Sequence, residues 1–83
     1  MTDHAPDRNS PHILIVEDDA TAAQAIAQAA IDVGAYPVLR ATFENGLTEA
    51  RTGKYRIIVF DRMLPGGDGI EAIARLRALG GRD

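Results

Sequence analysis

The sequence predicts one small α/β domain built around a parallel sheet, in the order strand, helix, strand, helix, strand, helix. Three observations predict this class: apolar runs rich in branched residues recur along the chain, helical periodicity fills the segments between them, and 83 residues leave room for one domain. Strands that alternate with helices pair in parallel and connect through right-handed crossovers.

Residues 1–11 differ in composition from the rest of the chain. They are polar and carry two prolines, and ordering them would cost backbone entropy without burying apolar surface. We therefore expect a disordered tail over residues 1–11 and a folded domain over residues 12–83. The domain opens with His12–Val16 (HILIV), an unbroken apolar run that is typical of a strand covered on both faces.

The first helix is expected over residues 20–33. Asp19 can cap its first turn, and Gly34 is the residue type that most easily ends a helix. Apolar residues recur at spacings of three and four, which places them on one helical face: Ala23, Ile26, Ala30 and Val33.

The second strand is expected over Tyr36–Arg40 (YPVLR). Pro37 lacks an amide hydrogen, so this strand fits best at an edge of the sheet. A short second helix is expected within residues 42–52, where apolar residues are spaced as on one helical face.

The third strand is expected over Arg56–Phe60 (RIIVF), which repeats the apolar character of the first strand. The sequence LPGGDG at 64–69 is expected to form a loop. A closing helix follows and reaches Gly80, and three residues mark its apolar face: Ile70, Ile73 and Leu76.

Acidic residues follow two strands of the predicted sheet. Glu17 and Asp18 follow the first strand and Asp61 follows the third, and parallel strands point their carboxyl ends to the same edge. If these strands are neighbours, the three carboxyl groups converge within a few ångströms. Two unit charges about 5 Å apart repel by roughly 3 kcal/mol at an effective dielectric near 20, so the site needs a cation, protonation or strong solvation. A hard divalent ion such as Mg²⁺ suits these oxygen ligands, and one carboxylate would remain free to attack a phosphoryl group.

Three segments together resemble the receiver domain of two-component response regulators: ILIVEDD at 13–19, YRIIVFDRMLPGGDG at 55–69 and IARLRALG at 73–80. The similarity is close to the branch whose members usually carry a winged-helix DNA-binding domain. The resemblance implies a flavodoxin-like parallel sheet with strand order 2-1-3. It also implies that the fold is incomplete, because the chain stops after the third helix whereas the family has five strands and five helices.

The resemblance implies roles for individual residues. Asp61 corresponds to the aspartate that accepts a phosphoryl group from a histidine kinase or a phosphotransfer protein. Asp18 corresponds to a direct Mg²⁺ ligand, Glu17 to an acid that contacts the ion through water, and Met63 to the position whose backbone carbonyl completes the site. Asp68 corresponds to the cap of the third helix.

The chain departs from the family pattern after the third helix. The fourth strand with its Ser or Thr and the fifth strand with its Lys are missing, and Lys54 stands at the opposite edge of the sheet from Asp61. A sheet that ends at the third strand has an apolar edge with unpaired backbone groups, so we expect self-association through that edge or through an uncovered sheet face. The alternative function is therefore a truncated receiver remnant that acts as an interaction or dimerisation module without phosphorylation.

The composition argues against other classes of function. The nine basic residues are unclustered and are outnumbered by twelve acidic ones, which argues against binding of nucleic acid by this chain. No Cys is present and no apolar run is long enough for a membrane span, so we expect a soluble, cytoplasmic protein without disulfides. A phosphatase of the haloacid dehalogenase type would need a second acid two residues after Asp61, where Met63 stands. We therefore expect signalling rather than turnover of an external substrate.

Overall fold

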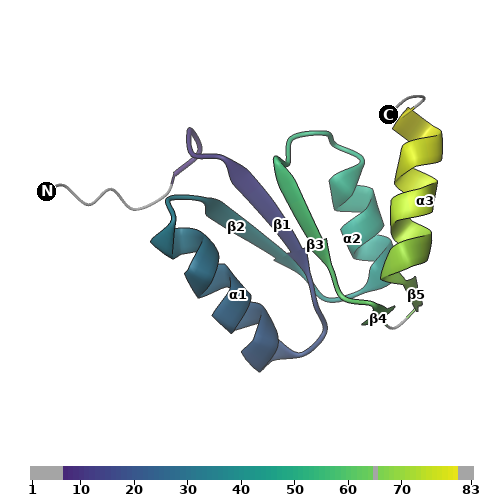
Figure 1. The fold of residues 1–83 in the computed structure, drawn as a ribbon, viewed down its shortest axis with the longest axis horizontal. Coiled ribbons are helices and arrows are strands. Elements are labelled where there is room, and N and C mark those ends of the chain that lie inside the picture. The colour runs from purple at the N-terminus through teal and green to yellow at the C-terminus, as the bar shows by residue number, and fades with distance from the viewer. Residues whose placement is uncertain (1–6, 65, 81–83) are drawn as a thin grey trace, which may run out of the picture.

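The sheet has three parallel strands, as predicted (Figure 1). The computed structural model describes residues 7–64 and 66–80. Within them, β1 (His12–Val16) lies at the centre of the sheet between β2 (Tyr36–Arg40) and β3 (Ile57–Phe60), which confirms the order β2-β1-β3. β3 begins one residue later than predicted, and the other two strands have the predicted bounds.

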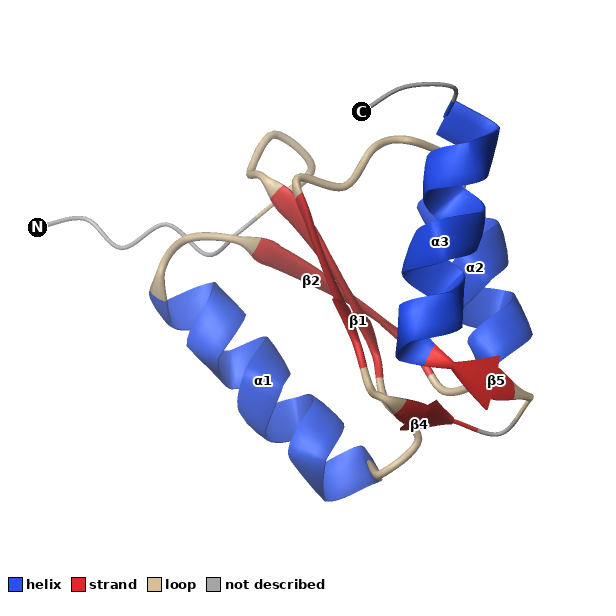
Figure 2. Cartoon of the chain, turned by 45° about the vertical axis from the view of Figure 1, so that its right-hand side comes forward, coloured by secondary structure: helices blue, strands red, loops and turns tan. Residues whose placement is uncertain are grey.

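In the part of the chain that the structure describes, three helices cover the two faces of this sheet. Figure 2 shows α1 (Ala20–Asp32) on one face and α2 (Phe43–Ala50) with α3 (Gly69–Gly80) on the other. The alternation of strands and helices confirms the predicted α/β architecture, an incomplete flavodoxin-like fold.

The central strand is paired along both of its edges. On β2 the register runs from His12 opposite Tyr36 to Val16 opposite Arg40, and on β3 it ends with Val16 opposite Phe60. The last three residues of β1 are fully buried, as expected for a strand covered on both faces.

The ends of α1 follow the predicted signals. The Asp19 carboxylate accepts a hydrogen bond from the Ala22 amide at 2.8 Å, which satisfies one of the free N–H groups of the first turn. After the helix, Gly34 adopts a φ of 86°, in the left-handed region that glycine enters most easily.

The face that α1 turns to the sheet consists of alanines. Ala23, Ala27 and Ala30 are buried, whereas Val33 is 78% exposed because the helix ends at Asp32. The prediction that the helix reaches Val33 and that Val33 lies on the same helical face as Ala23 and Ala30 is therefore wrong. Small side chains bury little apolar area, so the core on this side of the sheet is thin.

The larger part of the core lies between the sheet and the helices α2 and α3. Its buried members are Leu14, Val16, Phe43, Leu47, Ala50, Leu64 and Ala72. The ring of Phe43 is 1% exposed and lies 6.1 Å, centroid to centroid, from the ring of Phe60. Tilted aromatic pairs at this distance are favourable beyond the area that they bury.

The segment after β3 differs from its prediction as a loop. It contains two short strands, β4 (Met63–Leu64) and β5 (Gly67–Asp68), which form an antiparallel pair. Pro65, which belongs to the predicted loop, lies outside the described residues. Strands of two residues are too short to show the alternation on which the prediction of a strand depends.

The apolar face predicted for α3 is only partly buried. Leu76 packs against the core, but Ile70 and Ile73 are 57% and 50% exposed. Among the side chains of α3 that the structure describes, the fully buried one is Ala72, one helical turn before Leu76. Ile70 and Ile73 therefore belong to the exposed apolar surface of the described chain.

Residues 1–6 of the predicted disordered tail, and residues 81–83 of the predicted domain, lie outside the described residues. The described part of the tail forms a turn in which the Ser10 amide donates to the Asp7 carbonyl at 2.9 Å. The Pro11 carbonyl accepts a hydrogen bond from the Tyr36 amide at 2.8 Å, at the start of β2. Among the helices of the described residues, none is long and apolar enough to cross a membrane.

Candidate metal centre

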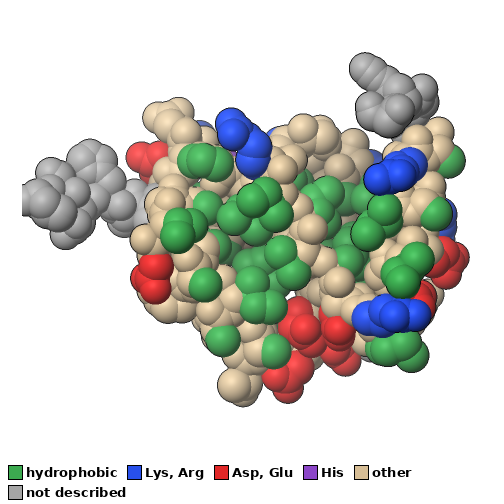
Figure 3. All heavy atoms as spheres, viewed as in Figure 1, with side chains coloured by type: hydrophobic (Ala, Val, Ile, Leu, Met, Phe, Trp, Pro, Cys, Tyr) green, Lys and Arg blue, Asp and Glu red, His purple; other side chains and the backbone are tan. Residues whose placement is uncertain are grey.

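Three carboxylates meet at the carboxyl edge of the sheet. Glu17 and Asp18 follow β1, Asp61 follows β3, and one carboxylate oxygen of each lies within 4.8 Å of the others. Acidic side chains gather at the lower edge of the molecule in Figure 3, where β1 and β3 end in Figure 1. The structure therefore brings together the three acids that the sequence analysis singled out.

Backbone hydrogen bonds place these residues. The Asp61 amide donates to the Val16 carbonyl at 2.9 Å, and the Glu17 amide donates to the Arg40 carbonyl at 2.9 Å. Both bonds continue the ladders of the sheet past the last paired residues of the strands. The convergence of the acids is thus a direct consequence of the pairing of β1 with its two neighbours.

The cluster is partly open to solvent. Asp18 is exposed, while Glu17 and Asp61 are half-buried. The ion pairs within the described residues involve none of the three carboxylates. Their mutual repulsion is therefore not offset by a described salt bridge, and a divalent cation bound between them would remove it.

Asp19, the third acid after β1, has a separate role. Its amide donates to Glu17 Oε2 at 3.1 Å, and its own carboxylate caps α1. The first bond orients the Glu17 side chain at the edge of the sheet. The second bond joins the Asp19 carboxylate to the first turn of α1, in agreement with the prediction that Asp19 caps this helix.

The hairpin of β4 and β5 borders the cluster beyond Asp61. Met63 pairs with Asp68, and the Met63 side chain is 73% exposed. Asp68 Oδ1 accepts a hydrogen bond from the Ile70 amide at 2.7 Å, as predicted for a cap of α3. The Gly69 amide donates to the carbonyl of Arg62, the residue after Asp61, at 2.9 Å. The role of the Met63 carbonyl as a metal ligand stays a prediction.

A cavity of about 220 Å³ opens beside Glu17 and Asp18. The start of α1 and the end of β2 supply its other walls, which include Ala23, Leu39 and Arg40. The small side chains of α1 leave this space next to the acids. Arg40 was not singled out from the sequence, because no motif marks it; its position at the end of the edge strand is the signal that could have found it. Its guanidinium pairs with Glu49 of α2 and makes no described ion pair with the three acids.

Lys54 lies at the other end of β3 from Asp61, as predicted. Its Nζ lies 3.6 Å from Glu49 Oε2 of α2. The position of Lys54 in the chain therefore gives it a partner on α2, and no described contact joins it to the carboxylate cluster.

Comparison with known proteins agrees with this geometry. The family model described as the response regulator receiver domain matches residues 13–82. The chain is also 39% identical, over 67 residues, to the uncharacterized transcriptional regulatory protein YkoG of Bacillus subtilis (strain 168). This similarity covers 80% of the chain and 29% of the relative, so the chain spans less than a third of that protein. The chain belongs to the response regulator receiver domain family.

Proposed function

We propose that Asp61 is a phosphoacceptor in two-component signalling and that it receives its phosphoryl group from a histidine kinase or a phosphotransfer protein. The observation that carries this proposal is the convergence of Glu17, Asp18 and Asp61, with oxygens within 4.8 Å of one another. Membership of the receiver family supports it, because a phosphoacceptor role follows from that family.

The donor set of the cluster fits Mg²⁺, which prefers oxygen ligands and is commonly held by one or two carboxylates together with waters. We assign Asp18 and Asp61 as direct ligands, Glu17 as a ligand through water, and the Met63 carbonyl as the remaining protein ligand. Mg²⁺ bound there would neutralise negative charge on the transferred phosphoryl group.

Asp61 supplies the nucleophile of the transfer. One of its carboxylate oxygens attacks phosphorus, a phosphorus–oxygen bond forms, and the bond from phosphorus to the donor's imidazole nitrogen breaks, with the electron pair staying on nitrogen. The hydrogen bond from the Asp61 amide to the Val16 carbonyl holds the backbone in place during the attack. The product is an aspartyl phosphate on the chain itself, so no external substrate is turned over.

We test this proposal by incubating the chain with Mg²⁺ and acetyl phosphate and then measuring its intact mass. We expect the unmodified chain to gain the mass of one phosphoryl group and Asp61→Asn to gain none. Asp19→Asn is the matched control, because it changes an acid beside the cluster and keeps a side chain that caps α1. This control should be phosphorylated like the unmodified chain.

Two results would contradict the phosphoacceptor role. One is an equal mass gain in Asp61→Asn, which would place the modification elsewhere. The other is no mass gain in the unmodified chain, which would favour the second candidate function below.

The second candidate is self-association of the chain without phosphorylation. β3 pairs with β1 alone among the described strands, and its residues Ile57 and Ile58 are 51% and 37% exposed. An edge strand of this composition presents free backbone groups to another chain. Figure 3 shows hydrophobic side chains exposed across the middle of one face of the molecule. We propose that a second copy of the chain pairs along this edge or packs on this face.

We place this signalling step in the cytoplasm and expect protein partners rather than nucleic acid for this chain. Its net charge is −3 and its basic residues are unclustered.

YkoG is described as a transcriptional regulatory protein. By analogy, we propose that the phosphorylated domain controls transcription through contacts to DNA made by another domain.

A further inference from the structure

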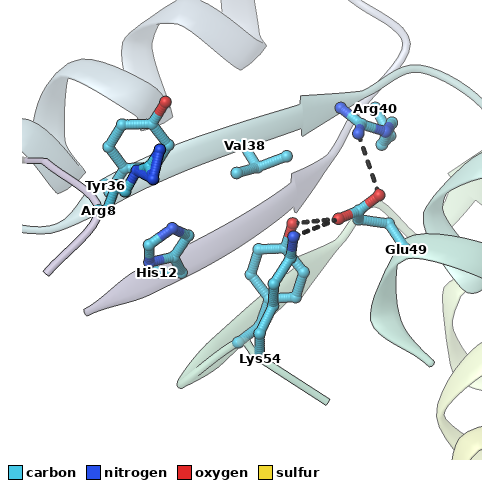
Figure 4. A pocket seen from close by; sticks show the side chains of 8 residues that line it. Arg8, His12, Tyr36, Val38, Arg40, Glu49 and Lys54 are labelled. Atoms are coloured by element: carbon cyan, nitrogen blue, oxygen red, sulfur yellow. Dashed lines mark hydrogen bonds and ion pairs between the residues drawn. The ribbon is translucent and has the colours of Figure 1, made fainter. Parts of the chain in front are cut away.

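A second cavity lies on the face of the sheet that α2 covers, away from the carboxylate cluster. Its volume is about 400 Å³, within the range of pockets that hold small molecules. Figure 4 shows Tyr36 and Arg8 on one side of this pocket and Arg40, Glu49 and Lys54 on the other. His12 and Val38, which come from β1 and β2, lie between the two sides.

The pocket is electropositive although the chain is acidic. Its lining contains three permanent cations, Arg8, Arg40 and Lys54, and one acid, Glu49, which leaves two positive charges in excess. The whole chain carries a net charge of −3. Positive charge is therefore concentrated in this pocket although the net charge of the chain is negative. This local excess of positive charge favours an anionic ligand.

The single acid of the pocket is already engaged. One Glu49 oxygen accepts from Arg40 Nη2 at 3.0 Å, and the other accepts from the Tyr55 hydroxyl at 2.5 Å. Lys54 lies 3.6 Å from Glu49 with a side chain 57% exposed, and Arg8 forms no ion pair with a described residue. Arg8 and Lys54 are therefore the cations that an incoming anion can reach.

The pocket also contains an aromatic surface. The ring of His12 lies 4.8 Å from that of Tyr36 and 6.2 Å from that of Tyr55, centroid to centroid. The side chain of Tyr36 is partly open, because the residue is 39% exposed. Rings of this kind stack with nucleic-acid bases irrespective of base identity.

We propose that this pocket binds a nucleoside monophosphate, whose base lies against Tyr36 and His12 and whose phosphate is attracted by Arg8 and Lys54, the cations at the two sides of the pocket. A phosphate monoester carries between about one and a half and two negative charges at neutral pH, which matches the excess of two positive charges. Arginine and lysine side chains are the usual partners of phosphate. This site is separate from Asp61, and its occupation does not depend on phosphorylation.

The test is isothermal titration calorimetry of the chain with AMP in metal-free buffer, with adenosine and inorganic phosphate as separate ligands. We expect one AMP per chain, bound at least about tenfold more tightly than either fragment, because both subsites are then used. Arg8→Ala and Tyr36→Leu should each weaken AMP about tenfold. Arg77→Ala removes an exposed arginine of α3 outside the pocket and should leave the affinity unchanged.

Circular dichroism shows whether each variant is folded. If Tyr36→Leu is not folded, Lys54→Gln is measured in its place. The proposal is overturned if AMP does not bind, or if it binds no more tightly than inorganic phosphate. It is also overturned if Arg77→Ala weakens AMP as much as Arg8→Ala does, since that result would indicate general attraction to positive charge.

Discussion

Glu49 of α2 joins three segments of the chain through its side chain. Its carboxylate accepts hydrogen bonds from Tyr55 and Arg40 and lies 3.6 Å from Lys54. The hydrogen bond from Tyr55 and the charge of Arg40 lower the pKa of Glu49, although burial opposes this effect. Burial and the hydrogen bond to Glu49 raise the pKa of Tyr55 to about 12. The pair is therefore most stable with Glu49 charged and Tyr55 neutral.

These shifts predict how stability depends on pH. The contribution of Glu49 is present above its ordinary pKa of 4.5 and is lost as the pH falls through its lowered pKa. The contribution of Tyr55 is present below its ordinary pKa of 10.0 and is lost as the pH rises through about 12. We expect Tyr55→Phe to lower the free energy of unfolding by about 1 kcal/mol at neutral pH and by less at both extremes. Urea unfolding over this pH range measures the difference.

Tyr36→Phe is the matched control for this measurement. Tyr36 also lies in the pocket, but no described hydrogen bond joins it to Glu49. Between acid and neutral pH its substitution should change stability by an amount that does not depend on pH. At alkaline pH the comparison is not flat, because the charge of Tyr36 contributes to the raised pKa of Tyr55. If the loss of unfolding free energy in Tyr55→Phe is equally independent of pH between acid and neutral pH, the role given to the hydrogen bond between Tyr55 and Glu49 is contradicted.

The residues of the candidate site were predictable to different degrees. Glu17, Asp18 and Asp61 could be predicted because each follows an apolar run, and parallel strands end at one edge. Arg40 was not predicted, because no motif marks it, and its place at the end of the predicted edge strand was the only available signal. Its proximity to the acids depends on the register of β2 against β1, which a single sequence does not specify.

At the scale of elements, the start of α3 is packed tightly against the end of β3. A Cβ atom added at Gly69 would lie 2.6 Å from the Asp61 carbonyl oxygen and 3.2 Å from that of Phe60. Backbone atoms cannot move aside as a flexible side chain can. Gly69 therefore sets the distance between α3 and the residue proposed to accept phosphate.

We predict that Gly69→Ala lowers the free energy of unfolding by about 1 to 3 kcal/mol, through overpacking, and also weakens binding of divalent cations. Gly34→Ala is the control: a Cβ at Gly34 meets no atom within 4 Å, and the cost of about 1 to 2 kcal/mol comes from its left-handed φ alone. Chemical denaturation and calorimetry with Mg²⁺ measure the two effects. Loss of cation binding in both variants, or in neither, would contradict the role of Gly69.

Elements of four or more residues were predictable from apolar runs and helical spacing, and most of their bounds are within one or two residues of the prediction. The pair of β4 and β5 could not be predicted, because a strand of two residues is too short to show the alternation of apolar and polar residues. The exposed side of α3 was also not predicted. Spacing shows that Ile70 and Ile73 share a helical face, but only the neighbouring elements decide whether that face is buried.

At the scale of the whole molecule, two similar apolar strands have different surroundings. The sequence of β1 is HILIV and that of β3 is IIVF, yet Leu14 and Ile15 are fully buried whereas Ile57 is 51% exposed. Composition alone predicts burial on both faces for each strand. The strand order, which we inferred from the resemblance to receiver domains, is what places one at the centre and the other at the edge of the described sheet.

This arrangement predicts that the 83-residue chain associates with itself. We expect light scattering after size exclusion to give an average mass that rises with concentration. Ile57→Lys adds a charge to the edge strand and should weaken association about tenfold or more. Val33→Lys is the control, because Val33 is 78% exposed and lies outside the sheet. A monomer at all concentrations, or equal dissociation by both variants, would contradict self-association through β3.

The central claim is that three acids from two distant parts of the chain, Glu17 and Asp18 after β1 and Asp61 after β3, share one divalent cation. A crystal grown with Mn²⁺, which takes the same oxygen ligands as Mg²⁺, tests it most directly. We predict one anomalous peak at the carboxyl edge of the sheet, within bonding distance of the carboxylates of Asp18 and Asp61. The absence of a peak there at saturating Mn²⁺, or side chains of these two residues that point to different sites, would contradict the account.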